Sequence, residues 1–258
     1  MADSRSAIGV FDSGVGGIGT LAQLRQELPQ EDFVYYGDTA HAPYGTKTPE
    51  EVLACVRRVM DELLARDVKA VVIACNTATS VAAAQLRAEM TLPIIGMEPA
   101  LKPAAEARRK GKILVLATPV TLRLEKFARL MERYGEGAER VPCPGLMELV
   151  EAQDFAQAEK YLTELLAKYP MDEVDSIVLG CTHYVFLRPV LMRILPEHVR
   201  VFDGNVGTAK QLRRVLDQHG LLNEETRQGS MTLLSSSESQ NEAVSVMYAL
   251  LNKAPVQL

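Results

Sequence analysis

The amino-acid sequence predicts an α/β protein made of two lobes with the same topology, each built on a parallel sheet. Short β-rich runs alternate with longer segments of helical spacing along the 258 residues, which is typical of parallel sheets covered by helices on both faces. The strands also repeat. Ile8 of IGVFDS matches Ile113 of ILVLAT, 105 residues later, and Cys75 matches Cys181, 106 residues later. A nearly constant offset indicates that one arrangement of strands occurs twice.

Nine runs are predicted to be strands, four in each repeat and one near the C-terminus. They are residues 7–12, 32–36, 69–75, 93–97, 112–117, 139–142, 175–180, 199–203 and 231–235. Among the helices between them, the segment 48–66 has the clearest start. Thr48 is a candidate N-cap, Pro49 takes the first helical position, and Glu50 and Glu51 follow in the first turn. Further helices are expected at 144–168 and near 238–253.

Composition excludes several classes of protein. Hydrophobic residues make up 47% and charged residues 24% of the chain, as in ordinary globular proteins. The four cysteines form no C-x-x-C pair, which argues against a zinc knuckle or a thioredoxin-type site. The N-terminus lacks a signal-peptide stretch, and no run approaches the roughly 18 apolar residues of a membrane span, so we expect a cytoplasmic protein. A net charge of −5 without a basic cluster argues against nucleic-acid binding.

Cys75 and Cys181 each stand at the end of a predicted strand and are followed by small polar residues. Parallel sheets bind ligands beyond the carboxyl ends of their strands, so two lobes facing each other would bring both thiols to one cleft. A thiol serves as base or acid according to its protonation state. Opposed thiols therefore suit the inversion of a carbon centre, in which one removes a proton and the other returns one to the opposite face. His183 is expected to exchange a proton near Cys181.

Other interpretations stay open for the remaining motifs. A free cysteine is usually a buried small hydrophobe; this is the interpretation for Cys55, within the predicted helix 48–66, whereas Cys143 is expected in a loop. The stretch FDSGVGGIG contains G-x-G-x-x-G and is followed by Asp38, which is close to a dinucleotide-binding fingerprint. An NAD(P)-dependent dehydrogenase and a noncatalytic amino-acid-binding protein are therefore alternatives. A pyridoxal enzyme has less support, because Lys47 and Lys102 fall at helix starts rather than beside a phosphate loop.

Five motifs together resemble the glutamate racemases. FDSGVGG, YGDTAHAPYG, ACNTATS, GMEPALKPA and GCTHYVFL stand in that family's order and at about its spacing, over nearly the whole chain. The resemblance implies a cofactor-independent isomerase that converts L-glutamate to D-glutamate for peptidoglycan synthesis in the cell wall. It implies two flavodoxin-like lobes related by pseudo-symmetry, with the active site in the cleft between them, and a homodimer. Lobe one would be residues 1–97 completed by 208–258, and lobe two 98–207.

The resemblance also implies residue roles. Cys75 would take the proton from D-glutamate and Cys181 from L-glutamate, with Asp12 supporting Cys75, and His183 with Glu148 supporting Cys181. No metal is implied. Substrate contacts are expected from Asp12, Ser13, Tyr44, Gly45, Asn76, Thr77, Thr118, Thr121, Thr182 and His183.

The chain departs from the family in one loop of lobe two. It has Val120 within Thr118-Pro119-Val120-Thr121, where the family usually has glycine. Because glycine tolerates positive φ and valine does not, we expect the backbone of this loop to differ from the family's.

Overall fold

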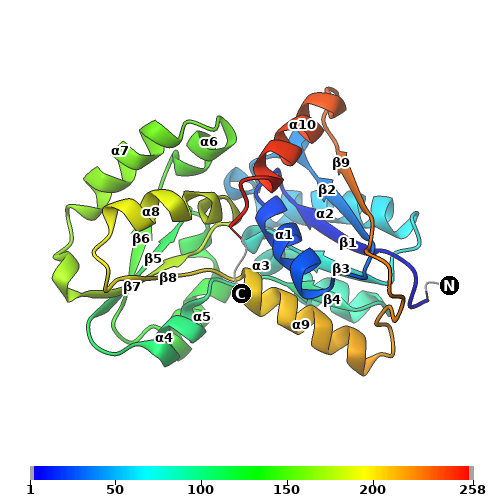
Figure 1. Ribbon diagram of the computed structural model, residues 1–258, viewed down its shortest axis with the longest axis horizontal. Coiled ribbons are helices and arrows are strands. Elements are labelled where there is room, and N and C mark those ends of the chain that lie inside the picture. Colours follow the sequence, from blue (N-terminus) through cyan, green and yellow to red (C-terminus); the bar gives the residue numbers. More distant parts are fainter. Residues whose placement is uncertain (1–2, 256–258) are drawn as a thin grey trace. The chain divides into compact units, whose positions relative to one another are not determined.

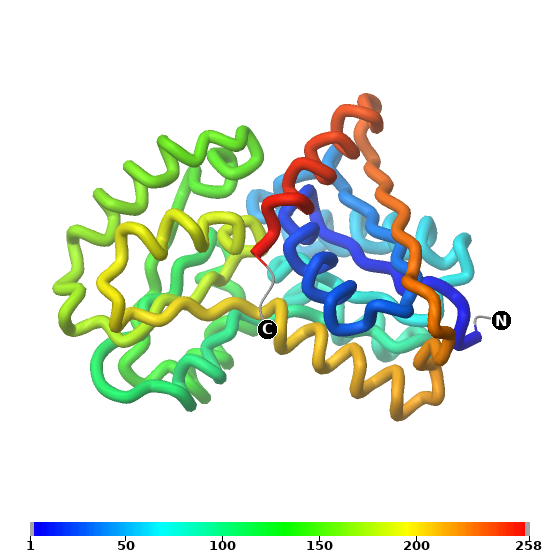
Figure 2. Tube along the Cα trace, in the orientation of Figure 1, coloured from blue at the N-terminus to red at the C-terminus, as the bar shows by residue number. Residues whose placement is uncertain are grey.

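The computed structural model describes residues 3–255 of the chain. These residues divide into two compact units. Unit 1 holds the chain up to Met97 and again from Asn205 onward, and unit 2 holds Glu98–Gly204. The chain therefore starts unit 1, builds all of unit 2, and returns to finish unit 1, as the colour sequence of the tube in Figure 2 shows.

Unit 1 is a five-stranded parallel sheet in the order β4-β3-β1-β2-β9 (Figure 1). Its strands are β1 (Ile8–Asp12), β2 (Phe33–Gly37), β3 (Ala70–Ile73), β4 (Ile94–Gly96) and β9 (Met231–Ser235). Its helices are α1 (Ile18–Glu27), α2 (Pro49–Leu64), α3 (Asn76–Glu89), α9 (Asn205–Gln218) and α10 (Gln240–Leu251). The central strands β1 and β3 are buried along their whole length, as parallel strands covered on both faces must be.

Unit 2 is a four-stranded parallel sheet in the order β6-β5-β7-β8. Its strands are β5 (Lys112–Ala117), β6 (Ala138–Pro142), β7 (Val174–Leu179) and β8 (Arg200–Phe202). Its helices are α4 (Leu101–Ala107), α5 (Glu125–Tyr134), α6 (Leu146–Glu151), α7 (Phe155–Leu166) and α8 (Arg188–Ile194). All nine predicted strands are therefore present, within one or two residues of the predicted bounds.

The two units repeat one topology, which confirms the repeat expected from the sequence. In chain order, the first four strands of each unit are arranged fourth-third-first-second, and unit 1 adds β9 beside β2. The backbone bonds repeat as well: Ala74 N donates to Phe11 O at 2.8 Å, and Gly180 N donates to Leu116 O at 2.7 Å. This 2-1-3-4 order is that of the first four strands of a flavodoxin-like sheet.

Hydrophobic packing fixes one face of each sheet. In unit 1, Phe11, Val71 and Ile73 pack under the buried residues of α2 and α3 in one cluster. In unit 2, Ile113 and Val115 pack with α4 and α5 in a second cluster. The apolar residues alternate with residues that face the opposite helices, because successive side chains of a strand point to opposite sides.

The predicted helix 144–168 is wrong as a single element. The structure divides it into α6 and α7. Gln153, between them, takes a positive φ of 55°, which no α-helix contains. Asp154 then caps α7 by accepting a hydrogen bond from Gln157 N at 3.0 Å. The break sets the end of α6 at Glu151, a residue of the candidate site.

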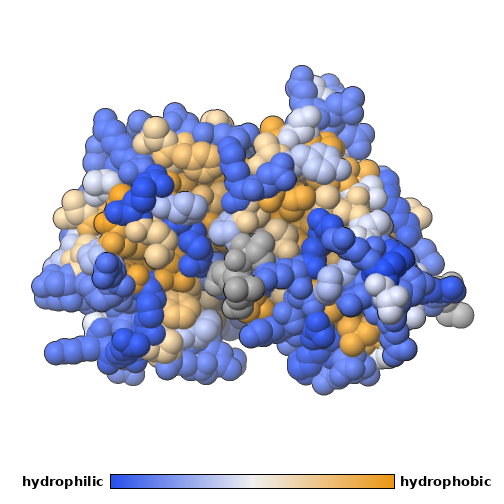
Figure 3. Space-filling view, in the orientation of Figure 1, coloured by the Kyte–Doolittle hydropathy of each residue, from blue (hydrophilic) through white to orange (hydrophobic). Residues whose placement is uncertain are grey.

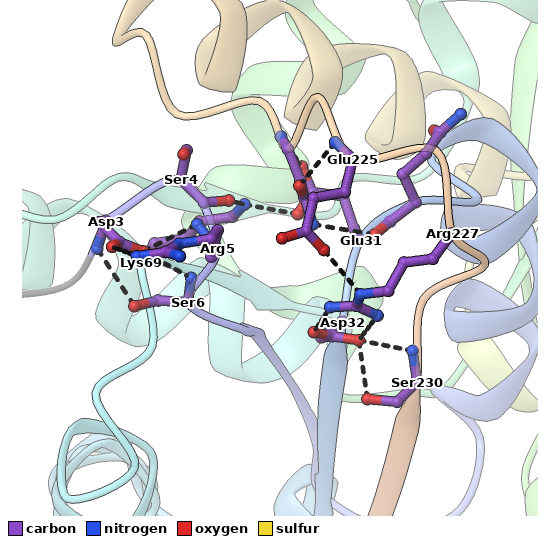
Figure 4. A network of polar contacts seen from close by, with 12 residues as sticks. Asp3, Ser4, Arg5, Ser6, Glu31, Asp32, Lys69, Glu225, Arg227 and Ser230 are labelled. Atoms are coloured by element: carbon purple, nitrogen blue, oxygen red, sulfur yellow. Dashed lines mark hydrogen bonds and ion pairs between the residues drawn. The ribbon is translucent and has the colours of Figure 1, made fainter.

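A polar network bonds the returning chain to the first half of unit 1 (Figure 4). Arg227, just before β9, pairs with Asp32 at 2.5 Å, and Asp32 also accepts from Ser230 N. Nearby, the buried Glu31 accepts a hydrogen bond from Asn223 N of the returning chain at 2.9 Å and also pairs with the fully buried Lys69 ammonium at 2.5 Å. These contacts attach the segment before β9 to the segment before β2, and so stabilise the pairing of the two strands.

On the face in Figure 3, polar side chains predominate and hydrophobic residues gather in patches among them. Within residues 3–255, no helix combines the length and the hydrophobicity that a bilayer crossing requires.

Candidate active site

Cys75 lies two residues beyond the end of β3, where it caps helix α3. Its Sγ accepts a hydrogen bond from Ala78 N at 3.4 Å and lies 3.5 Å from Ser13 Oγ. The thiol is buried, with 6% of the residue exposed. Because the first N–H groups of a helix favour a negative charge, this position favours an anionic sulfur. Asn76 and Thr77, the next residues, are buried in the first turn of α3.

Asp12 ends β1 beside this helix start and is fully buried. Its Oδ2 accepts a hydrogen bond from Gly14 N at 3.0 Å. The first N–H group of the glycine-rich turn is therefore already hydrogen-bonded to a carboxylate. Such a carboxylate would repel a pyrophosphate, which argues against the dinucleotide alternative. The turn is also tightly packed: a Cβ on Gly17 would lie 2.7 Å from Asp12 Cβ and 3.0 Å from Ala74 Cβ.

Tyr44 and Gly45 form a single 3₁₀ turn, Tyr44–Thr46, after β2. The Tyr44 side chain is buried, and its hydroxyl donates to Asp38 Oδ2 at 2.6 Å. Burial, together with this hydrogen bond, raises the pKa of Tyr44 far above its ordinary value, so the phenol keeps its proton. Asp38, which the sequence offered only as a dinucleotide ligand, is thus the partner that orients Tyr44.

Cys181 takes the matching position in unit 2, two residues beyond the end of β7. Its Sγ lies 3.8 Å from His183 Nδ1, and His183 Nε2 lies 2.9 Å from Glu151 Oε1. The thiol is partly exposed, and a 3₁₀ helix, Thr182–Leu187, follows it instead of the α-helix that follows Cys75. A thiol, an imidazole and a carboxylate in a row are the arrangement by which a base activates a nucleophile.

The carboxylate beside His183 is Glu151, whereas the resemblance implies Glu148 as the carboxylate that supports Cys181. Both residues lie on α6, but Glu148 is exposed and Glu151 is half-buried at the end of the helix. Burial alone would raise the pKa of Glu151, yet the hydrogen bond and charge of His183 outweigh it and hold that pKa below its usual range. An ionised Glu151 keeps the proton of the ring on Nε2, which leaves Nδ1 as the acceptor toward Cys181.

The loop after β5 brings Thr118 and Thr121 together. Their hydroxyl oxygens lie 2.9 Å apart, and Thr121 N donates to Thr118 Oγ1 at 3.3 Å. Val120 has φ −72° and ψ −47°, a right-handed helical conformation that any residue adopts. The loop therefore accommodates valine without a positive φ. Thr182, the proposed contact next to Cys181, is buried.

The other two cysteines differ from this pair. Burial raises the pKa of the Cys143 thiol to about 12, so the thiol stays protonated near neutral pH. Cys55 is buried in the core cluster of unit 1 and accepts a hydrogen bond from Arg58 Nη2 at 3.3 Å. Among the residues that the structure describes, no cluster of three or more His, Cys, Asp or Glu side chains could hold a metal ion.

Comparisons with known proteins show which family this chain resembles. The family model described as Asp/Glu/Hydantoin racemase matches residues 19–212. A glutamate racemase of Clostridium botulinum is 46% identical over 250 residues, which cover 95% of this chain and 96% of that protein. A crystal structure of glutamate racemase from Thermus thermophilus, in complex with β-chloro-D-alanine, superimposes with a TM-score of 0.83 at 34% identity, covering 98% of this chain and 96% of that one. The Escherichia coli glutamate racemase, in complex with L-glutamate and the activator UDP-MurNAc-Ala, gives a TM-score of 0.83 at 27% identity, covering 98% of this chain and 96% of that one.

Proposed function

The chain belongs to the Asp/Glu/Hydantoin racemase family and is therefore an isomerase, and we propose that it interconverts L- and D-glutamate with Cys75 and Cys181 as its two proton-transfer groups. The observation that carries the proposal is the equivalent position of the two thiols. Each stands two residues beyond the third strand of its unit, and the residue before it donates to the first strand of that unit. A duplicated fold thus presents one thiol per copy.

The chemistry assigned to the pair is a transfer at Cα. One sulfur, as thiolate, removes the Cα proton from one face of glutamate, and the other, as thiol, gives a proton to the opposite face. The two thiols then hold reversed protonation states, ready for the opposite enantiomer. A single base would tend to return the proton to the face it left, whereas two opposed bases invert the centre.

Different surroundings support the two thiolates. For Cys75, the α3 N-terminus and Ser13 contact the sulfur, and we assign Asp12 a supporting role there. For Cys181, His183 accepts the thiol proton at Nδ1 while Glu151 stabilises the resulting imidazolium. We propose that the L-enantiomer loses its proton to Cys181 and the D-enantiomer to Cys75.

Substrate binding is assigned to polar residues near the carboxyl edges of both sheets. Backbone and hydroxyl groups there suit the carboxylates of glutamate. The proposed contacts are Asp12, Ser13, Tyr44, Gly45, Asn76, Thr77, Thr118, Thr121, Thr182 and His183.

Racemisation in heavy water tests the two-base chemistry. Starting from either enantiomer, we expect product molecules to carry deuterium at Cα from the first turnovers, while the remaining substrate stays unlabelled. The labels are read by mass spectrometry after chiral separation. Product that keeps its original protium would rule out two opposed bases.

Replacing either thiol tests the assignment of residues. We expect Cys75→Ser and Cys181→Ser each to lower kcat by about 10³-fold or more, because a hydroxyl is a much poorer base at neutral pH. Cys143→Ala, which removes a buried thiol from the same chain, is the matched control and should keep most of the activity. Near wild-type turnover in either serine variant would defeat the assignment.

We further propose that the D-glutamate enters peptidoglycan, and that the enzyme works in the cytoplasm as a homodimer. Expression in a bacterial strain that requires D-glutamate should restore growth without the supplement, and Cys75→Ser should not. Sedimentation of the purified chain tests the dimer.

A further inference from the structure

A continuous row of polar contacts links helix α2 to the turn that holds Tyr44. The Tyr44 hydroxyl donates to Asp38 Oδ2 at 2.6 Å, and Asp38 Oδ1 lies 2.7 Å from His41 Nδ1. His41 Nε2 lies 3.0 Å from Arg58 Nη1, and Arg58 Nη2 donates to Cys55 Sγ at 3.3 Å. The row therefore runs from a buried thiol in α2, through the side chains of Arg58, His41 and Asp38, to the phenol of a proposed substrate-binding residue.

The direction of each hydrogen bond follows from Arg58. A guanidinium only donates, so His41 Nε2 accepts from it. The neutral ring then carries its proton on Nδ1 and donates to Asp38. The Asp38 carboxylate accepts from both His41 and Tyr44. Arg58 thus sets the tautomer and the orientation of His41, and through it the position of the Asp38 carboxylate.

Both ends of the row, Cys55 and Tyr44, are buried in the core cluster of unit 1, whereas Arg58 is exposed and His41 is partly exposed. Arg58 belongs to α2, whose Val56 and Val59 are buried in the core and whose Cys55 is 4% exposed. Residues 39–47, here called the 39–47 segment, contain only two single 3₁₀ turns, Thr39–His41 and Tyr44–Thr46. The segment has little regular structure to hold itself and gains its order from side-chain contacts.

A cavity lies beside the 39–47 segment, next to the contact between Arg58 and His41. Its volume is about 300 Å³, and Tyr36, Asp38, His41, Arg58, Asp61 and Glu62 are among its lining residues. Val59 and Ser236 complete the lining. At the edge of this space, the His41 imidazole makes two hydrogen bonds, with Asp38 Oδ1 and with Arg58 Nη1.

We propose that Arg58 and His41 are positioning residues for substrate binding: through Asp38, they hold Tyr44 and Gly45 in the conformation that contacts glutamate. The inference rests on the proposed function, which assigns those two residues to the substrate. Neither Arg58 nor His41 touches the reacting atoms. Their removal should therefore change the affinity for glutamate more than the chemical step.

Kinetics of Arg58→Met test this role. We expect KM to rise about tenfold, the factor that about 1.4 kcal/mol represents, with kcat within about twofold of wild type. Arg58→Lys, which keeps a donor for His41 Nε2, should recover part of the loss. The matched control is Arg57→Met, because Arg57 is the adjacent residue of α2, carries the same charge and makes an exposed pair with Glu89. Its KM should not change.

A double-mutant cycle tests the route of the effect. If Arg58 acts through Asp38 on Tyr44, then Arg58→Met should raise KM much less in a Tyr44→Phe background than in the wild type. If Arg58→Met raised KM by the same factor in both backgrounds, the effect would not pass through Asp38 and Tyr44, and this route would be wrong. Arg57→Met combined with Tyr44→Phe should be additive.

Hydrogen exchange gives a readout that does not depend on activity. In the free protein, Arg58→Met should speed amide exchange in the 39–47 segment, where His41 N and Lys47 N are hydrogen-bonded, and leave β3 unchanged. Unchanged exchange in this segment, or the same change in Arg57→Met, would overturn the positioning role. If exchange changes as expected and the wild-type protein lacks racemase activity, the proposed function fails while the positioning of the segment stands.

Discussion

The two proposed proton-transfer cysteines have different neighbours, although their backbone positions match. Cys75 receives a backbone N–H from its helix, whereas Cys181 has an imidazole backed by the Glu151 carboxylate. The N–H groups at the start of α3 are a fixed part of the backbone, whereas the effect of an imidazole on the neighbouring thiol depends on the protonation state of the ring. We therefore expect a change at Glu151 to affect proton transfer at Cys181 more than proton transfer at Cys75.

Glu151→Gln should lower kcat/KM by about 10- to 100-fold, because the amide cannot stabilise the imidazolium that forms when His183 takes the thiol proton. The factor must be equal in both directions, since the enantiomers have equal free energies. With substrates deuterated at Cα, the isotope effect on kcat/KM should rise for L-glutamate and fall for D-glutamate. The comparison is made by circular dichroism with each enantiomer.

Glu148→Gln is the matched control for Glu151→Gln. It removes the same charge from the same helix, at an exposed position three residues earlier, and should leave kcat/KM within about twofold of wild type. A larger loss in Glu148→Gln than in Glu151→Gln would return the supporting role to the residue first expected from the sequence.

At the scale of secondary structure, α2 connects local sequence signals to the site. Its start has a complete capping box: Glu51 N donates to Thr48 Oγ1 at 3.3 Å, and Thr48 N donates to Glu51 Oε2 at 2.8 Å. Pro49 fills the first position, where its missing N–H does no harm. The helix that carries Arg58 thus begins at a defined residue.

Thr48→Ala should reduce the free energy of unfolding by about 1 kcal/mol, the usual effect of losing an N-cap side chain. Urea unfolding followed by circular dichroism measures it. Glu50→Ala removes a first-turn acid that is outside the box and should reduce stability by only a few tenths of a kcal/mol. Equal effects of the two changes would mean that the box does not stabilise this helix.

The elements show what local sequence predicts and what it leaves open. The strands and the start of α2 were predictable because their signals, the β-rich runs and the Thr-Pro-Glu-Glu sequence, depend only on residues next to each other in the chain. The break at Gln153 was not, since no glycine or proline marks the positive φ there. The choice between Glu148 and Glu151 was not either, because it depends on how α6 packs against the segment after β7. Arg58 was missed for the same reason: its partner His41 is brought near only by the fold.

At the scale of the whole chain, the contacts of Arg227 link stability to pH. The hydrogen bond from Arg227 is the largest influence on Asp32 and holds the pKa of that carboxyl well below its usual range, although burial opposes it. A carboxylate with a lowered pKa in the folded state contributes stability above its unfolded pKa of about 3.9, and loses it as pH falls through the folded value.

Arg227→Met should therefore be less stable than wild type by a constant amount between about pH 5 and pH 7, and the difference should shrink as the pH falls below about 4. Urea unfolding at pH 7, 5 and 3 measures this. Arg57→Met, which removes an exposed arginine of another ion pair, should differ from wild type by an amount that varies little with pH. A gap for Arg227→Met that is the same at pH 3 and pH 7 would contradict the assigned cause.

The late return of the chain to unit 1 determines the order of events during synthesis. All of unit 2 emerges from the ribosome before β9 and α10 do, so unit 2 has every residue it needs to fold while unit 1 still lacks an edge strand. Until then β2 offers unpaired backbone groups to any neighbouring nascent chain. A translation pause after unit 2 has emerged and before β9 emerges would prolong that exposure.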